Sequence, residues 1–383
     1  MSKRITIMGS TGSIGTNTLE VVRALGSDYR VVGLAARQRW AELESQCRAV
    51  EPQVVAIADP KCAEQLRRML NGQVEVLEGE AGLVELAGHR DTDFVVAAIV
   101  GSAGLASTIA AVEAGRHVGL ANKEALVMAG SLIVPLARQT GARLLPIDSK
   151  HSAIFQAMSA GSVDEVRKIY LTASGGPFRT WPMEKIASAT PADALLHPTW
   201  TMGPKITVDS ATMVNKAMEI IEAHWLFGIE VDAIEVVIHP ESIVHSMVEF
   251  CDRSIIAQMG QPDMRTPIQY ALTYPRRLRG CARDLDFSAI GQLRFEPPDL
   301  HRFPALRLGY EVARAGGTAG AVFNAANEAA VEAFLQGRIP FGRIVDTIRE
   351  VLDRHAVQSN PNLGSILQSD AWARNEVKEC LKS

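Results

Sequence analysis

A glycine-rich turn close to the N-terminus constrains the fold of this chain more than any other feature. The apolar segment 5–8 has the pattern of a buried strand, the sequence G-S-T-G-S-I-G follows at residues 9–15, and a helical segment follows from residue 18. This order is typical of a dinucleotide-binding unit, because glycines let the backbone approach a pyrophosphate at a helix N-terminus. The spacing G-x-x-G-x-x-G differs from the more common G-x-G-x-x-G, so a tight turn without a ligand also fits.

Further strand patterns alternate with helical segments through the first 150 residues. They lie at residues 30–36, 54–58, 94–100, 117–121 and 143–147. Such alternation predicts a Rossmann-like parallel sheet, in which ligands bind beyond the carboxyl ends of the strands.

The residues after the second strand indicate which nicotinamide cofactor is bound. An NAD-specific enzyme places Asp or Glu there to hold the ribose 2′-hydroxyl. This chain has Arg37, Gln38 and Arg39, with no acidic residue before Glu42. Guanidinium groups can hold a 2′-phosphate through paired hydrogen bonds, so the sequence predicts NADP(H).

The chain of 383 residues is too long for one ordinary core. We expect an α/β protein: a Rossmann-like NADPH-binding domain at 1–150, an α+β catalytic and dimerisation domain at 151–273, a linker at 274–300 and a C-terminal α-helical domain at 301–383. The alternating segments 233–238, 243–248 and 254–259 predict a strand meander, whose open edge or face could pair with a second subunit. Helical periodicity follows at 305–315, 324–335, 341–354 and 369–381.

Composition excludes several classes of partner. The net charge of −4 predicts no general attraction to nucleic acid or to an anionic membrane, and no apolar run is long enough to span a bilayer. The five cysteines are scattered without a C-x-x-C pair, and the first residues lead directly into a strand. We therefore expect a cytoplasmic protein with reduced thiols and no signal peptide.

A polar segment at residues 209–219 carries the most chemistry. Its pattern predicts the start of one helix, capped by Asp209 or Ser210. Asn215 and Glu219 are four residues apart and share a face. An anion suits the hydroxyl and the ammonium of Lys216, and a metal cation suits Glu219 one turn further. A capped amphipathic helix with a solvated polar face fits the same spacing.

Other candidate residues lie at predicted strand ends or in loops. Each also fits an ordinary loop position. They are Gly101, Asn122, Lys123 and Glu124; Asp148, Ser149, Lys150 and His151; the turn Ser174-Gly175-Gly176, which could form an oxyanion nest; and the loop 197–204 around Trp200, which suits a lid. For His239 and His245, a structural role is the simpler interpretation.

Together these motifs resemble one family. They are GSTGSIG at 9–15, ANKE at 121–124, Asp148-Ser149, SGGP at 174–177, His197-Pro198 with Trp200 and Met202-Gly203, the segment from Ser210 to Glu219, and PDMRTP at 262–267. In this order they are similar to the 1-deoxy-D-xylulose 5-phosphate reductoisomerases. The similarity runs from the first strand to the last helices.

The resemblance implies a homodimeric enzyme of non-mevalonate isoprenoid biosynthesis that requires NADPH and Mg²⁺ or Mn²⁺. Such an enzyme rearranges a keto-sugar phosphate to a branched aldehyde and reduces it to 2-C-methyl-D-erythritol 4-phosphate. Matching positions assign Thr11, Gly12, Ser13, Ile14, Asn122, Glu124 and Gly203 to NADPH; Ser174, His197, Ser210, Asn215 and Lys216 to the phosphate; Lys123 and Ser149 to the substrate body; and Asp148 and Glu219 to the metal, with Glu219 also beside the substrate. Catalytic candidates are Lys123, Ser149, Lys150 and His197.

One position departs from the family pattern. The third metal ligand of the family is a glutamate two residues after the aspartate, and this chain has Lys150 there. Two carboxylates and one ammonium replace three carboxylates, so we expect a weaker metal site. A catalytically impaired form that still binds NADPH is therefore one alternative. Another NADP oxidoreductase, such as a semialdehyde or homoserine dehydrogenase, is a further alternative, but it leaves the Ser-Gly-Gly turn and the helix with Glu219 unexplained.

Overall fold

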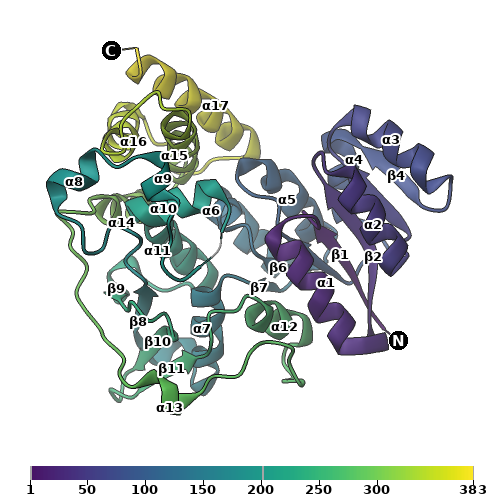
Figure 1. Ribbon diagram of the computed structural model, residues 1–383, viewed down its shortest axis with the longest axis horizontal. Coiled ribbons are helices and arrows are strands. Elements are labelled where there is room, and N and C mark those ends of the chain that lie inside the picture. Colours follow the sequence, from purple (N-terminus) through teal and green to yellow (C-terminus); the bar gives the residue numbers. More distant parts are fainter. Residues whose placement is uncertain (1, 201, 383) are drawn as a thin grey trace. The chain divides into compact units, whose positions relative to one another are not determined.

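The computed structural model describes residues 2–200 and 202–382. Backbone contacts divide the chain into two compact units (Figure 1). Unit 1 comprises Met1–Ala125, Ile133–Ser152 and Asp263–Arg283, and unit 2 comprises Leu126–Leu132, Ala153–Pro262 and Asp284–Ser383. The domain boundaries expected at residues 150, 273 and 300 stay a prediction.

Unit 1 is built on a seven-stranded parallel sheet, as the alternating pattern predicted. The strand order is β4-β3-β2-β1-β5-β6-β7. The strands are β1 (Lys3–Met8), β2 (Tyr29–Ala36), β3 (Val54–Ile57), β4 (Glu75–Glu78), β5 (Phe94–Ala97), β6 (His117–Leu120) and β7 (Leu144–Pro146). The order changes direction at β1, where the sheet of a doubly wound fold offers a ligand crevice.

The helices of unit 1 pack on this sheet in pairs. Contacts join α1 (Ser13–Leu25) to α12 (Arg265–Thr273), α2 (Trp40–Val50) to α3 (Pro60–Leu70), and α4 (Gly79–Ala87) to α5 (Leu105–Glu113). The short 3-10 turns are η1 (Gly26–Asp28) and η2 (Ser102–Gly104). Two more helices, α6 (Lys123–Thr140) and α7 (Ser149–Ala157), contain residues of both units.

The glycine turn after β1 owes its shape to missing side chains. Gly9 has φ +88°, which L side chains rarely adopt, and a Cβ atom on Gly15 would lie 2.4 Å from the Gly9 carbonyl oxygen. The backbone N–H groups of Gly9 and Ser10 donate to the Ala35 carbonyl at 3.0 and 2.8 Å. The turn is therefore fixed at the carboxyl end of β2, directly before α1.

Unit 2 contains a four-stranded mixed sheet in the order β11-β10-β8-β9. The strands are β8 (Val166–Ala173), β9 (Ile234–Ile238), β10 (Val244–Phe250) and β11 (Ile255–Met259). The three expected strands are present, but the meander is wrong: β8 lies between β9 and β10, parallel to the former and antiparallel to the latter. The segment 168–173, which lies before the Ser-Gly-Gly turn, supplies this inserted strand.

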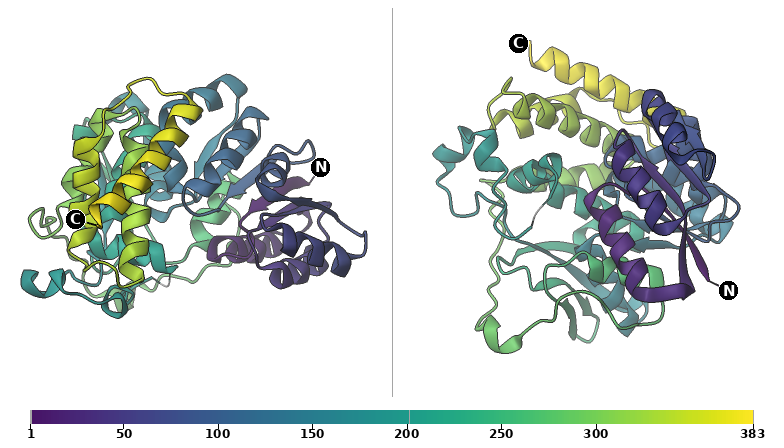
Figure 2. Two further views of the ribbon diagram at one scale, coloured as in Figure 1. Left: turned by 90° about the horizontal axis from the view of Figure 1, so that it is seen from above. Right: turned by 45° about the vertical axis from the view of Figure 1, so that its right-hand side comes forward.

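Helices make up most of unit 2. They are α8 (Met183–Ala187), α9 (Pro191–Ala194), α10 (Pro204–Thr212), α11 (Val214–Phe227), α13 (Phe287–Ile290), α14 (Ala305–Ala315), α15 (Ala319–Leu335), α16 (Arg343–Arg354) and α17 (Leu363–Cys380), with 3-10 turns η3 (Met158–Ala160), η4 (Val163–Glu165) and η5 (Val231–Ala233). The C-terminal helices, green to yellow in Figure 2, pack on one another, and α14 packs on α11. The expected C-terminal helical region is confirmed.

The expected single helix over 209–219 is wrong. Met213 has φ +62° and ψ 11°, so it ends α10 and begins α11. Neither Asp209 nor Ser210 is a cap, because both lie inside α10. Nothing in the apolar periodicity marks this break, since Met213 and Val214 are both buried as the helical stripe requires.

Within the residues that the structure describes, no helix is both long and apolar enough to cross a bilayer.

Candidate active site

The glycine turn of unit 1 meets the arginine loop, as a nucleotide site requires. Gly12 is the N-cap of α1, and no side chain caps this helix end, so its first N–H groups are open to an anion. The Arg39 Nη1 atom donates to the Thr11 carbonyl at 2.9 Å, and the side chain of Gln38 donates to Asp59 at 3.3 Å. The first contact holds the exposed, cationic Arg39 beside the N-terminus of α1.

Asn122 follows β6 and holds the neighbouring loop in place. Its amide nitrogen donates to the carbonyls of Ile99 and Gly101 at 2.5 and 3.0 Å, and its Oδ1 atom caps α6 at Ala125. A Cβ atom on Gly104 would lie 2.1 Å from this amide. Asn122 thus shapes the strand-end loop with its side chain, and Glu124 lies buried two residues later.

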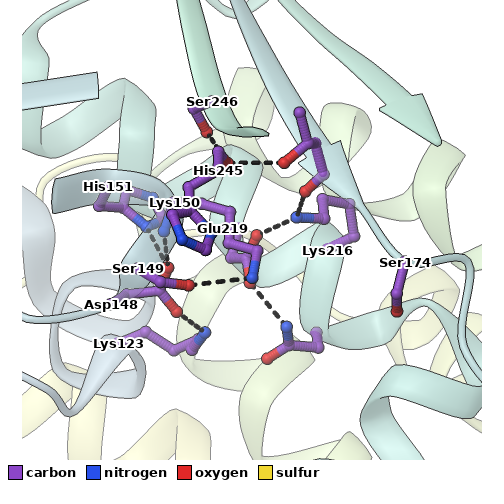
Figure 3. A network of polar contacts seen from close by, with 12 residues as sticks. Lys123, Asp148, Ser149, Lys150, His151, Ser174, Lys216, Glu219, His245 and Ser246 are labelled. Carbon is purple, nitrogen blue, oxygen red and sulfur yellow. Dashed lines mark hydrogen bonds and ion pairs between the residues drawn. The ribbon is translucent and has the colours of Figure 1, made fainter. Parts of the chain in front are cut away.

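A largely shielded carboxylate in unit 1 lies at the centre of a charged cluster. Asp148 follows β7, and its Oδ2 atom lies 2.7 Å from the Lys123 ammonium (Figure 3). Its Oδ1 atom accepts from the Lys150 backbone N–H at 2.9 Å and lies 3.3 Å from the His151 ring. The Lys150 ammonium donates to the Ser149 hydroxyl at 2.9 Å.

These neighbours keep Asp148 ionised. Burial by itself would raise the pKa of the Asp148 carboxyl, but Lys123, His151 and Lys150 outweigh burial and hold that pKa well below its ordinary value. The structure therefore joins the predicted residues Lys123, Asp148, Ser149 and Lys150 in one cluster. It adds a direct contact from the fully buried His151 ring to Asp148.

A second buried carboxylate lies in unit 2, on the first turns of α11. Glu219 is 1% exposed and forms an ion pair with Lys216, which is 4% exposed. The Asn215 amide donates to the Glu219 Oε1 atom at 2.6 Å, and the Lys216 ammonium also donates to the Thr172 carbonyl at 2.5 Å. Lys216 and Glu219 therefore form a pair in the N-terminal part of α11 (Figure 3), and Asn215 bonds to the same carboxylate.

The Ser-Gly-Gly turn of unit 2 binds the loop that was expected to form a lid. The His197 Nδ1 atom accepts hydrogen bonds from the backbone N–H groups of Thr199 and Trp200 at 3.1 and 2.9 Å. The neutral ring must then carry its proton on Nε2, which lies 3.2 Å from the Ser174 Oγ atom and donates to it. The Ser174 hydroxyl hydrogen is left to point toward another acceptor.

Ser210 lies against the same turn, although not at a helix N-terminus. A Cβ atom on Gly176, which has φ +71°, would lie 2.6 Å from the Ser210 carbonyl oxygen. The backbone of the turn thus touches the last turn of α10. Gly203 is the N-cap of that helix, and residue 201, inside the expected lid, lies outside the described residues.

His239 has the structural role expected of it. Its Nε2 atom accepts from the N–H groups of Ile243 and Val244 at 3.1 Å, and its Nδ1 atom lies 2.8 Å from the Arg294 carbonyl. Both ring nitrogens are used by the backbone. His245 lies beside Trp200, with ring centroids 6.4 Å apart, and its role stays a prediction.

The donor set fits a divalent metal only in part. Asp148 and Glu219 offer carboxylates, but each is paired with a lysine, and the third expected position presents the Lys150 ammonium. Across residues 2–200 and 202–382, no three His, Cys, Asp or Glu side chains form a cluster that could hold a metal ion. A hard divalent ion prefers several oxygen ligands, so these residues supply less than it requires.

Three protein-family models match the chain. "1-deoxy-D-xylulose 5-phosphate reductoisomerase" matches residues 5–130, its "C-terminal domain" matches 144–227, and "DXP reductoisomerase C-terminal domain" matches 259–376. The reductoisomerase of Pelotomaculum thermopropionicum is 50% identical over 97% of both chains. That of Ralstonia nicotianae is 50% identical over 99% of this chain and 100% of its own.

Solved structures give the same result. The reductoisomerase of Zymomonas mobilis, in complex with NADPH, aligns with a TM-score of 0.95 and 42% identity over 100% of both chains. A reductoisomerase in complex with NADPH, fosmidomycin and magnesium aligns with a TM-score of 0.93 and 39% identity, covering 99% of this chain and 98% of the other.

Proposed function

Because the chain belongs to the 1-deoxy-D-xylulose 5-phosphate reductoisomerase family, we propose that it makes 2-C-methyl-D-erythritol 4-phosphate and that the candidate residues described above carry out this reaction. The substrate is 1-deoxy-D-xylulose 5-phosphate, and the reductant is NADPH. The observation that carries the residue assignment is a group of close contacts in unit 2: Ser174 with His197, Gly176 with Ser210, and Lys216 with Glu219 and with the Thr172 carbonyl, two residues before Ser174.

This set suits the phosphate of the substrate. The neutral His197 ring donates to Ser174, so the Ser174 hydroxyl can donate to a phosphate oxygen. Asn215 and Lys216 lie in the first turn of α11, where the N–H groups and the helix dipole favour an anion. Binding energy from the phosphate, which does not react, then positions the carbon skeleton.

NADPH is assigned to the glycine turn of unit 1. The pyrophosphate is placed at the α1 N-terminus, with Thr11, Gly12, Ser13 and Ile14 around it. Arg37 and Arg39, with Gln38 between them, are assigned to the 2′-phosphate. Asn122, Glu124 and Gly203 are also assigned to NADPH.

Lys123 and Ser149 are assigned to the substrate body. Lys123 neutralises the buried Asp148 carboxylate, and its ammonium can donate to a substrate oxygen while it stays charged. Ser149 is oriented by the Lys150 ammonium. Closure of the loop 197–204 would exclude water before the hydride is transferred.

A Mg²⁺ or Mn²⁺ ion would supply charge stabilisation for two substrate oxygens when bound. Asp148 and Glu219 are its proposed ligands. Lys150 weakens this site, and it is the reason that a catalytically impaired, NADPH-binding form is the second candidate function. The two candidates differ in metal-dependent turnover, not in NADPH affinity.

A homodimer in the cytoplasm is also proposed. Strand β11 is an edge strand, and Ile255 and Ile256 are 51% and 38% exposed on it. An exposed apolar edge suits pairing with a second copy of the chain. The cysteines of the described residues are all free thiols, which suits a reducing compartment.

The assay is NADPH absorbance in the presence of 1-deoxy-D-xylulose 5-phosphate, with and without Mn²⁺. We expect NADPH oxidation that depends on both the substrate and the metal, with 2-C-methyl-D-erythritol 4-phosphate as product. NADPH binding without any oxidation at saturating Mn²⁺ would instead identify the impaired form.

A further inference from the structure

A buried polar contact behind Ser210 has no part in the chemistry assigned so far. We propose that Asp209 is a positioning residue, which fixes Ser210 for the substrate phosphate by attaching α10 to the C-terminal helices through Asn327. This inference rests on the proposed function of the phosphate site. It adds a specific link between the phosphate site and α15, a helix to which no contact with substrate, cofactor or metal is assigned.

Asp209 lies deep in unit 2 and uses both carboxylate oxygens. It is 2% exposed, and its Oδ1 atom accepts from the Asn327 amide nitrogen at 2.9 Å. Its Oδ2 atom lies 2.7 Å from the Lys205 ammonium, one turn earlier on α10. Asn327 is fully buried on α15 and lies 118 residues away in the sequence. A charge at this depth is stable only while its partners remain, so the contact is specific.

The break at Met213 gives this contact a role. The left-handed Met213 ends α10 and begins α11, so the hydrogen bonds of α11 do not continue through Ser210. The packing of α10 and its polar contacts must therefore set the direction of Ser210. Asp209 is adjacent to Ser210 in the sequence, so the Asn327 contact acts directly on it.

The Ser-Gly-Gly turn contacts the backbone of α10 at Ser210. The Gly176 backbone lies so close to the Ser210 carbonyl that a Cβ atom would be 2.6 Å from it. A small rotation of α10 would either press on this turn or withdraw from it. The contact of Asn327 with Asp209 and the close approach of Gly176 to the Ser210 carbonyl therefore both constrain the position of Ser210.

The ion pair of Asp209 with Lys205 lies at the C-terminal end of the loop 197–204. Lys205 lies in the first turn of α10, directly after the Gly203 N-cap and Pro204. Its ammonium faces Asp209 rather than the phosphate site. Loss of Asp209 would therefore disturb the loop base as well as Ser210, and a larger effect is expected from Asp209 than from Asn327.

The test compares Asn327→Ala with a matched control, Asn324→Ala. Asn324 is also fully buried on α15, and its amide donates to Glu328 within the same helix rather than to α10. Both variants lose a buried amide contact, so similar losses of thermal stability are expected. We expect Asn327→Ala alone to raise the KM for 1-deoxy-D-xylulose 5-phosphate about tenfold, with the KM for NADPH unchanged in both.

Calorimetric binding of 1-deoxy-D-xylulose 5-phosphate without added metal gives a readout that needs no turnover. The same tenfold loss of affinity is expected there. An inactive wild-type protein would refute the proposed activity, but the binding measurement would still test the positioning role. The isosteric Asp209→Asn variant should weaken substrate binding, and the double variant Asp209→Asn/Asn327→Ala should be no weaker than Asp209→Asn. Equal substrate affinity in Asn327→Ala and Asn324→Ala, or additive effects in the double variant, would overturn the proposal.

Discussion

The Nζ atom of Lys123, in the first turn of α6, lies 2.7 Å from the Oδ2 atom of Asp148 at the end of β7. The two side chains are 5% and 16% exposed, so the pair is largely shielded from solvent. A shielded pair is costly to break on one side, because the remaining charge is left without its partner. The ion pair therefore gives Lys123 a role in the stability of the fold, which can be measured separately from any role in catalysis.

Lys123→Met should destabilise the fold most strongly at neutral pH. In the wild type, the low pKa of Asp148 contributes stability above the unfolded-state pKa of about 3.9, and this is lost as the pH falls through the folded-state value. In the variant, only His151 and Lys150 oppose the effect of burial, so the pKa of Asp148 is higher than in the wild type and protonation relieves the less stabilised charge as the pH falls. The difference in unfolding free energy between the two proteins should shrink from pH ~7 to pH ~3.5. The control is Lys168→Met, which removes the ion-pair partner of the exposed Glu235. If the difference in unfolding free energy between the wild type and Lys123→Met did not change with pH, this account would be contradicted.

Ser174→Ala should weaken substrate binding without affecting the cofactor. The variant removes the hydroxyl that accepts from His197 and that is proposed to donate to the phosphate. We expect the KM for 1-deoxy-D-xylulose 5-phosphate to rise about tenfold, for one lost hydrogen bond to a charged group, and the KM for NADPH to stay the same. The exposed Ser188, which bonds only locally to the Lys185 carbonyl, supplies the control Ser188→Ala. An unchanged substrate KM in Ser174→Ala would remove Ser174 from the phosphate site.

Arg39→Ala should reduce the preference for NADPH over NADH. Arg39 is held at the glycine turn by the Thr11 carbonyl, where a guanidinium can meet the 2′-phosphate. The ratio of kcat/KM for the two cofactors should fall about tenfold, because only NADPH loses a charged contact. Arg30→Ala, at an exposed position in β2, should leave the ratio unchanged. A similar fall with both cofactors would indicate a structural role for Arg39.

The sequence predicted the sheet of unit 1 well, because parallel strands buried on both faces produce continuous apolar runs. Strand β4 was not predicted, because its sequence E-V-L-E has exposed residues at both ends and only two apolar residues between them. The insertion of β8 between β9 and β10 could not be predicted, because strand order in a mixed sheet depends on long-range packing.

The candidate residues were predicted better than the geometry that holds them. The strand-end position indicated Asp148, but its contact with His151 depends on how α7 begins. The break at Met213 could not be predicted, because Met213 and Val214 are both buried and continue into the apolar stripe of α11. Likewise, the helical periodicity of segment 324–335 does not indicate the contact of Asn327 with Asp209, which lies 118 residues away in the sequence.

The requirement for Mn²⁺ tests the central claim, a reductoisomerase whose metal site is weakened by Lys150. The rate of NADPH oxidation with 1-deoxy-D-xylulose 5-phosphate is measured against Mn²⁺ concentration for the wild type and Lys150→Glu, with Lys61→Glu, on the exposed start of α3, as the charge control. Restoring a third carboxylate should lower the half-saturating Mn²⁺ concentration at least about tenfold, about 1.4 kcal/mol of binding free energy, while Lys61→Glu leaves it unchanged. Equal Mn²⁺ requirements in the wild type and Lys150→Glu would contradict the account.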